Sequence, residues 1–215
     1  GERELFRDLS FSLAPGEWLH LRGVNGAGKT SLLRILCGLL RPENGAVFWQ
    51  NENIALQPEL YHANLCYIGH ASGLKDELSA LENLRLLHAA TAARPLNDMP
   101  LVDSLRQIGL ENYLHRPVRT LSQGQKRRVA LAKLGISQAP LWILDEPLAS
   151  LDGEAIQVIR DLLVNHLRAK GMLVMTSHQT IDLTIPGREL WIGNRPEDNS
   201  LDHAHASNDT MASCV

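Results

Sequence analysis

The feature that most constrains this chain is a glycine-rich run between an apolar stretch and a segment with the apolar spacing of a helix. The run consists of Gly23, Val24, Asn25, Gly26, Ala27, Gly28, Lys29 and Thr30. Its spacing matches the pattern G-x-x-x-x-G-K-[ST], in which glycines let successive backbone N–H groups point inward around a polyphosphate. The dipole of the following helix adds about half a positive charge at the same place. The run therefore predicts a polyphosphate-binding loop.

The residues around this loop predict a strand, loop and helix unit. Trp18 to Gly23 has the apolar character of a strand, and Lys29 to Leu40 continues as an apolar helix that ends before a proline. Within the unit, Lys29 is expected to reach the β and γ phosphates of the bound polyphosphate, and the Thr30 hydroxyl is expected to bind Mg²⁺. Ser31, the next residue, is included among the predicted nucleotide contacts.

A second run supplies two acidic residues at the predicted edge of the sheet. Leu141 to Leu144 is apolar throughout, as in a buried strand, and Asp145 and Glu146 follow it directly. The carboxyl ends of parallel strands form the ligand-binding edge of open α/β sheets. We therefore expect Asp145 to hold Mg²⁺ through water and Glu146 to act as the general base for an attacking water. The alternative for this run alone is a buried strand capped by two solvated carboxylates.

Composition limits the class of protein. A chain of 215 residues with 44% hydrophobic residues is long enough for one sizeable core. Its formal net charge of -3 disfavours direct nucleic-acid binding. Cys37, Cys66 and Cys214 lack the spacing of a disulfide framework or a zinc site, which favours a reducing, cytosolic compartment. No stretch is apolar enough over its length to span a bilayer, so any membrane role is expected to be peripheral.

The remaining pattern predicts a parallel sheet interrupted by helices. Mostly helical residues are expected over about 70–139, followed by a return to strand and helix alternation. Within this insertion, Ser79 and Glu82 form a capping box that opens a helix. The other expected elements are strands at 46–50, 64–69 and 173–176 and helices at 79–93, 100–108 and 154–170. Residues 1–193 are expected to form one domain, and the polar tail 194–215 to be poorly ordered.

A third run of residues resembles the signature of a known family. Leu121, Ser122, Gln123, Gly124 and Gln125 resemble the signature sequence, usually Leu-Ser-Gly-Gly-Gln, of ATP-binding cassette (ABC) ATPases. The resemblance covers about residues 8–193 and implies a P-loop NTPase fold of the ABC type. Such a fold has a RecA-like parallel sheet core, a small antiparallel β subdomain and a helical insertion. A polar helix cap is the alternative for this run alone.

The resemblance also implies how ATP is enclosed. Ser122 and the N–H groups around Gly124 would open a helix and face the γ phosphate of ATP bound by a second copy of the chain. Two ATP molecules are then held in a head-to-tail homodimer, which hydrolysis reopens. Ser122, Gln123, Gly124 and Gln125 therefore join the predicted nucleotide contacts.

Two more landmarks of the family have counterparts, and two positions depart from its pattern. Ala149 to Asp152 resembles the loop that crosses the dimer interface, and His178 resembles the switch histidine that senses the γ phosphate. His70 stands where most members carry a glutamine that contacts metal and water, and we expect His70 to take that place. Gln123 replaces a glycine of the signature. The aromatic residue that stacks on adenine would precede the first residues, so none is assigned.

Within the family, one segment resembles the ATP-binding subunit of the bacterial haem exporter of cytochrome c maturation. The resemblance is carried by Tyr67 to His70, Gly73 to Lys75 and Leu78 to Leu84. It implies an ATP hydrolase on the cytoplasmic face of the inner membrane, bound to membrane-embedded cytochrome c maturation proteins through the helical insertion. No residue is expected to bind haem directly, and His203 and His205 in the tail are interpreted as solvated.

Other functions are weighed against this interpretation. An ATPase subunit for another exported cargo shares all the motifs named above. Cassette ATPases that act on ribosomes or DNA usually carry two cassettes or long coiled-coil or zinc insertions, and this sequence has none of these. A phosphotransferase could share the phosphate loop, but it would leave Leu121 to Gln125 unexplained.

Overall fold

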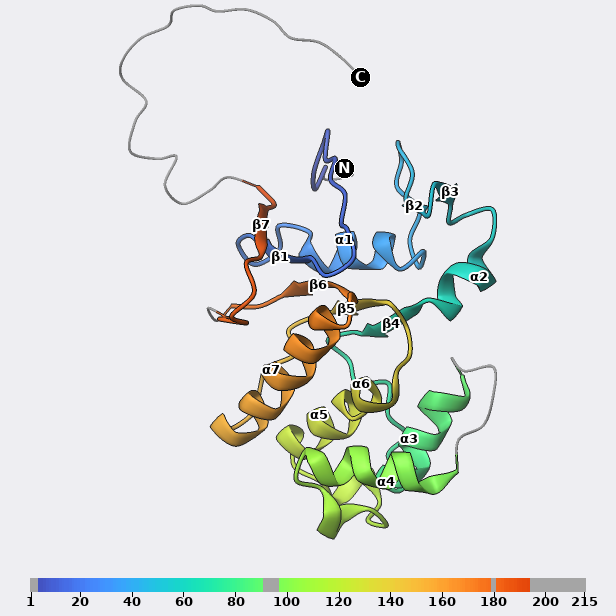
Figure 1. Ribbon diagram of the computed structural model, residues 1–215, viewed down its shortest axis with the longest axis vertical. Helices are drawn as coiled ribbons and strands as arrows, with labels where there is room; N and C mark the ends of the chain where they lie inside the picture. The colour runs from blue at the N-terminus through green and yellow to red at the C-terminus, as the bar shows by residue number, and fades with distance from the viewer. Residues whose placement is uncertain (1–3, 91–96, 179–180, 194–215) are drawn as a thin grey trace, which may run out of the picture.

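The computed structural model of this chain describes residues 4–90, 97–178 and 181–193 (Figure 1). Its centre is a five-stranded sheet with the strand order β4-β5-β6-β1-β7, and every neighbouring pair is parallel. The strands are β1 (Trp18–Arg22), β4 (Leu65–Ile68), β5 (Leu141–Leu144), β6 (Met172–Thr176) and β7 (Arg188–Trp191). The parallel sheet predicted from the sequence is confirmed.

Side chains of the central strands alternate between two apolar clusters, one on each face of the sheet. In β5, Leu141 and Ile143 join the cluster that holds the apolar side of α1 (Lys29–Leu36). Trp142 and Leu144 join the cluster that holds the apolar side of α7 (Gly153–Arg168). This alternation is the period of two that a strand imposes on its side chains. The result is a three-layer arrangement, with α1 and α7 on opposite faces (Figure 1).

Helix α1 is shorter than the sequence analysis predicts, because it ends at Leu36 and not at Leu40. Gly38 has a φ of 71°, a left-handed value that glycine adopts without steric cost. With the chain turned in this way, the Leu39 N–H donates to the Arg34 carbonyl at 2.8 Å. This bond closes the last helical turn, as in the Schellman motif. The proline that was expected to stop the helix lies beyond this glycine.

A small antiparallel sheet follows α1, as predicted, but its strands are short. Strand β2 (Phe48–Trp49) pairs with β3 (Glu52–Asn53) through the two-residue turn Gln50-Asn51. Both turn residues have positive φ, 51° and 66°, which is the geometry of a type I′ hairpin turn. The strand expected at 46–50 is therefore cut to two residues, and β3 lies in a segment that the sequence analysis left without structure.

Helix α2 (Pro58–Ala63) is a second element that the sequence analysis missed. Its proline lies at the first helical turn, where a missing N–H costs nothing. The Tyr61 hydroxyl donates to the Leu36 carbonyl at 2.5 Å, and His62 Nε2 lies 3.0 Å from the Cys37 carbonyl. Helix α2 thus holds the carbonyl groups at the C-terminus of α1.

The helices of the insertion pack beneath the sheet, on the same side as α7 (Figure 1). They are α3 (Ala80–Ala89), α4 (Asp98–Gln107), α5 (Gln123–Leu131) and α6 (Lys133–Ile136), with 3-10 turns at Glu111–Tyr113 and Val118–Thr120. The predicted capping box is present. The Glu82 N–H donates to the Ser79 hydroxyl at 3.3 Å, and the Ser79 N–H donates to the Glu82 carboxylate at 2.8 Å.

Other expectations differ in their bounds or lie outside the described residues. Helix α4 starts at Asp98, before the expected residue 100, and β7 was not predicted at all. The tail 194–215, with its two histidines, and the end of the helix expected at 79–93 lie outside the described residues. Cys37 and Cys66 are buried free thiols. Among the described residues, none of the helices has the length and apolar character needed to cross a bilayer.

The capping box gives a prediction about stability. Replacing Ser79 with alanine removes the side chain that accepts the Glu82 N–H, so the free energy of unfolding should fall by about 1 kcal/mol. Asn97 caps α4 without a side-chain cap bond, and Asn97→Ala should therefore cost less than Ser79→Ala. Urea unfolding of both variants measures the difference. Equal losses would show that the capping box contributes nothing beyond an ordinary helix start.

Candidate functional site

The glycine-rich loop joins β1 to α1 at the carboxyl edge of the sheet. Gly26 and Gly28 have positive φ values of 79° and 105°, and Gly28 is the N-cap of α1. The Ala27 N–H donates to the Val24 carbonyl at 3.1 Å, which folds the loop back on itself. The loop therefore presents its backbone at the positive end of a helix dipole, where anions bind.

Lys29 lies over this loop. Its ammonium group donates to the Gly23 carbonyl at 2.7 Å and to the Val24 carbonyl at 3.1 Å. Within the described part of the chain, no carboxylate lies within ion-pair distance of it. The charge of Lys29 is therefore held in the loop by carbonyl dipoles alone and remains available to an incoming phosphate.

Asp145 is buried at the end of β5, and each of its carboxylate oxygens accepts a hydrogen bond. Thr30 donates to Oδ2 at 2.9 Å, and Thr176 donates to Oδ1 at 2.7 Å. Two predicted metal ligands, Thr30 and Asp145, are thus brought together although they lie far apart in the sequence. A carboxylate and a hydroxyl are hard oxygen ligands of the kind that Mg²⁺ prefers. These two residues fit a magnesium site.

Glu146 has an unusual backbone conformation. Its φ is 50°, a left-handed value that is uncommon for a residue with a side chain. Its N–H donates to the Thr176 hydroxyl at 2.9 Å, and its carbonyl accepts from Arg127 at 2.9 Å. Such strained conformations are concentrated at functional sites, and they persist where neighbouring groups hold them.

The structure brings Glu146 and His178 together. The His178 N–H donates to Glu146 Oε2 at 3.2 Å, and His178 Nε2 lies 3.4 Å from Glu146 Oε1. The Glu146 side chain is only 16% exposed, whereas that of His178 is 60% exposed. The histidine is therefore positioned to contact both this carboxylate and a ligand in solvent.

Thr176 was not identified from the sequence. Its fully buried hydroxyl donates to Asp145 and accepts from the Glu146 N–H, so one oxygen joins both acids. The register of the sheet could have revealed it. Leu144 pairs with Met175 in the parallel ladder, which places the next residues, Asp145 and Thr176, side by side.

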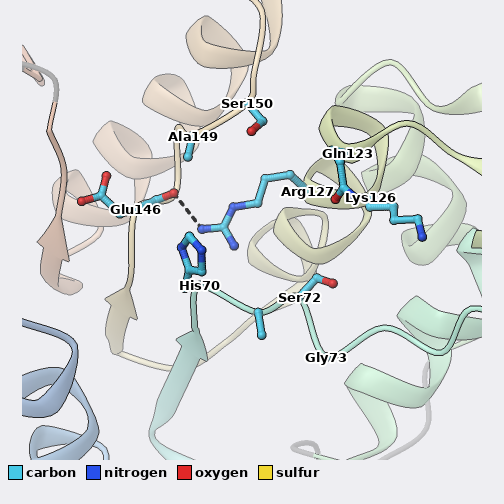
Figure 2. Close-up of a pocket in the computed structure, with 10 residues that line it drawn as sticks. His70, Ser72, Gly73, Gln123, Lys126, Arg127, Glu146, Ala149 and Ser150 are labelled. Carbon is cyan, nitrogen blue, oxygen red and sulfur yellow. Dashed lines mark hydrogen bonds between the residues drawn. The ribbon is translucent and has the colours of Figure 1, made fainter.

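Arg127 is the second residue that the sequence analysis missed. It lies in α5, is 7% exposed, and donates to the carbonyls of Gly69, Asp145 and Glu146. Figure 2 shows the bond to Glu146 and the residues that surround it. Together they line a pocket of about 360 Å³, to which His70 and Gln123 also contribute. A run of basic residues directly after the signature was the available signal.

His70 follows β4 and lies between two pockets. One contains Glu146, and the other, of about 370 Å³, contains Thr30. Within the described part of the chain, His70 makes no hydrogen bond to Thr30 or Asp145. No group of three or more histidine, cysteine and acidic side chains that could hold a metal occurs among the described residues. A role for His70 at the metal therefore stays a prediction.

The signature residues open α5 in the predicted way. Ser122 is the N-cap, and it exchanges hydrogen bonds with Gln125 in a second capping box. Ser122 and Gln123 are exposed. A side chain at Gly124 would come within 2.7 Å of the Ser150 carbonyl, so glycine lets the loop after β5 pack against the signature. Across the described residues, no hydrogen bond joins the signature to the phosphate loop.

The loop after β5 is tied to the same helix by charge. Asp152 is the N-cap of α7, where its carboxylate accepts from the Ala155 N–H at 3.0 Å. The same carboxylate forms an ion pair with Arg128 of α5. The segment Ala149 to Asp152, which resembles the loop at the dimer interface, is therefore fixed relative to the signature.

Comparisons with known proteins agree on one family. The sequence profile described as ABC transporter matches residues 6–149. A cytochrome c biogenesis ATP-binding export protein CcmA from Dechloromonas aromatica is 47% identical over 194 residues, which cover 90% of this chain and 95% of that protein. The protein of the same name from Yersinia pestis is 41% identical over 208 residues, covering 96% of this chain and 94% of the relative.

Solved structures share the fold. The ATP-binding subunit of an ABC transporter superposes with a TM-score of 0.73 at 30% identity, covering 81% of this chain and 73% of that one. A dimeric bacterial ABC transporter cassette superposes with a TM-score of 0.78 at 21% identity, covering 87% and 86% of the two chains. At that lower identity the likeness concerns the fold alone.

The double role of Thr176 gives a prediction. Thr176→Val keeps the shape of the side chain but leaves Asp145 Oδ1 and the Glu146 N–H without this partner, so the free energy of unfolding should fall by about 1–3 kcal/mol. Thr176→Ser retains the hydroxyl and should cost less. Urea unfolding measures both variants. If the valine variant unfolds with the same free energy as the unmodified chain, the hydroxyl contributes nothing to stability.

Proposed function

This chain belongs to the ABC transporter family, and on that premise we propose that it is the ATP-binding and hydrolysing subunit of the haem exporter of cytochrome c maturation. The observation that supports ATP hydrolysis is a series of hydrogen bonds beside the phosphate loop. It links Thr30 to Asp145, Asp145 to Thr176, and Thr176 to the backbone of Glu146. The haem-related cargo is supported by relatives whose name states cytochrome c biogenesis export. Cytochromes c carry haem, so haem is the cargo that fits such an export.

Binding of ATP begins at the phosphate loop. The loop amides and the N-terminus of α1 attract the phosphates, and Lys29 exchanges its bonds to Gly23 and Val24 for phosphate oxygens. Thr30 and Asp145 would hold Mg²⁺, with His70 as a candidate for a further contact. That ion supplies charge neutralisation between the β and γ phosphates. Ser31 and the remaining loop residues complete the proposed nucleotide contacts.

Hydrolysis depends on Glu146. Its carboxylate is largely buried, and we assign to it the role of orienting the attacking water and accepting its proton. His178 bonds to this carboxylate through its backbone N–H while its ring faces solvent, which suits contact with the γ phosphate. Thr176, itself bonded to Asp145, holds the N–H of Glu146 in place.

The second half of each ATP site comes from another copy of this chain. Ser122 to Gln125 form a helix N-terminus, exposed at Ser122 and Gln123, that makes no hydrogen bond to the phosphate loop of the same chain, within the described residues. In a head-to-tail homodimer, this N-terminus would face the γ phosphate bound by the partner. Closure of the dimer on ATP and its opening after hydrolysis would be the work stroke.

The membrane partners are proposed on the same basis. We assign the chain to the cytoplasmic face of the bacterial inner membrane, as a peripheral subunit. Membrane-embedded cytochrome c maturation proteins would dock on the helical insertion beside His70. The cargo would be handled by these partners, and no residue of this chain is assigned to haem or to nucleic acid.

The assignment of Glu146 can be tested by conservative substitution. Glu146→Gln keeps the size of the side chain and removes the proton acceptor, so the rate of ATP hydrolysis should fall by about 10²- to 10⁴-fold. ATP affinity should be unchanged, and ATP should trap a dimer that size-exclusion chromatography detects. Glu154→Gln, at the exposed start of α7, is the matched control and should keep full activity. Full turnover by the Glu146 variant would remove it from the mechanism.

The cargo can be tested through the partners. Tagged full-length protein, purified from detergent-solubilised membranes of its source bacterium, should bring down cytochrome c maturation proteins, identified by mass spectrometry. The same membranes carrying the tag alone serve as the control. Co-purification of an unrelated permease would support the assignment as a transporter ATPase and would contradict haem as the cargo.

A further inference from the structure

One buried guanidinium lies where three backbone carbonyls converge. Arg127 Nη1 donates to the Gly69 carbonyl at 2.8 Å, and Nη2 donates to the carbonyls of Asp145 and Glu146 at 2.7 and 2.9 Å. The side chain crosses the pocket from α5 toward the ends of β4 and β5 (Figure 2). Burial lowers the pKa of the guanidinium, while the nearby Asp145 and Glu146 carboxylates raise it. Arginine remains charged in proteins.

These carbonyls lie where the pairing of β4 with β5 ends. The Asp145 N–H donates to the Ile68 carbonyl at 2.8 Å, which extends the ladder by one bond. Beyond that bond, Gly69 and Glu146 leave the regular strands; the Glu146 carbonyl accepts a longer bond from the Ala149 N–H at 3.2 Å, and the guanidinium adds a shorter one. A buried carbonyl without a partner would cost about 1–3 kcal/mol. Arg127 donates to all three carbonyls. It thereby joins the end of β4, at Gly69, to the end of β5, where Asp145 and Glu146 lie.

Glu146 depends on this arginine more than the other two residues do. Its left-handed backbone is held from one side by Thr176, at its N–H, and from the other by Arg127, at its carbonyl. The direction of the Glu146 carboxylate follows from this backbone conformation. Removal of Arg127 leaves the carbonyl of this strained peptide with only the longer bond from the Ala149 N–H, at 3.2 Å.

We propose that Arg127 is a positioning residue that fixes the carboxylate of Glu146 for hydrolysis and couples it to the signature helix. The inference rests on the proposed function, because it assigns Arg127 a role in that reaction. Helix α5 begins at the signature residue Ser122 and carries Arg127 little more than one turn later. A movement of the signature therefore reaches the catalytic acid of the same chain through a single side chain.

Lysine cannot reproduce this arrangement. The guanidinium is a planar fork whose donors reach separate acceptors in fixed directions, whereas an ammonium is a single compact charge on a flexible stem. A lysine at this position would satisfy some of the three carbonyls at the expense of the others. Positioning by Arg127 therefore predicts an intermediate effect for lysine and a full effect for an uncharged side chain of similar length.

The test is single-turnover ATP hydrolysis by the full chain, with protein in excess over ATP, together with ATP affinity in the presence of Mg²⁺. Single turnovers separate the chemical step from product release. Arg127→Met should lower the rate by about 10²-fold, as expected when a reacting group is displaced by about 1 Å. Its ATP affinity should match the unmodified chain. Arg127→Lys should show an intermediate rate.

A matched control is Arg85→Met. Arg85 lies in α3, pairs with Asp98 at the surface and contacts none of the strand ends, so its loss should leave rate and affinity unchanged. Circular dichroism establishes folding of each variant. If Arg127→Met does not fold, Arg127→Lys carries the test, and a slowed single turnover with unchanged affinity supports the inference.

The outcomes separate this inference from the function on which it rests. A folded Arg127→Met or Arg127→Lys variant that hydrolyses at the unmodified rate would overturn the inference while leaving the ATPase intact. Equal losses of rate and affinity would also overturn it, since the arginine would then only support the fold. An unmodified chain that fails to bind ATP would overturn the proposed function together with the inference.

Discussion

The candidate site depends on the register between β5 and β6. Because Leu144 pairs with Met175, the residues that follow, Asp145 and Thr176, come together at the carboxyl edge of the sheet. The Thr176 hydroxyl then bonds to Asp145 and to the backbone of Glu146, while Thr30 from α1 bonds to the other oxygen of Asp145. A slip of one residue would turn the side chains of a strand to the opposite face. Strand pairing therefore determines which groups meet the nucleotide.

Sequence reasoning located the parts of the site that are coded locally. The phosphate loop, the acids after β5 and the helix caps at Ser79 and Ser122 are short patterns whose backbone geometry follows from neighbouring residues. The alternation of the central strands β1, β5 and β6 with helices could be predicted as well, because apolar periodicity reveals it. The roles assigned to the site residues remain predictions, although the structure brings several of these residues into contact.

What the sequence analysis missed depends on contacts between distant segments. Thr176 and Arg127 act through partners in other elements. No local pattern marks the threonine, and the basic run after the signature does not show which of its members reaches the strand ends. Strand β7 has exposed residues at its start and, among the described residues, pairs with β1 alone. Helix α2 is short, and its contact with the end of α1 comes from Tyr61 and His62, which a sequence pattern does not single out. The early end of α1 did have a local signal, Gly38.

The close approach of Gly124 to Ser150 bears on which signature positions tolerate substitution. Any side chain at position 124 would have to displace the Ser150 carbonyl, so the packing of this loop requires glycine there. Position 123 is the first residue of α5 and is exposed, so it accepts a longer side chain without moving the backbone. The one departure of this chain from the usual signature, Gln123, thus falls where a longer side chain meets no backbone of its own chain. Two adjacent positions of one motif are therefore under unequal steric constraint.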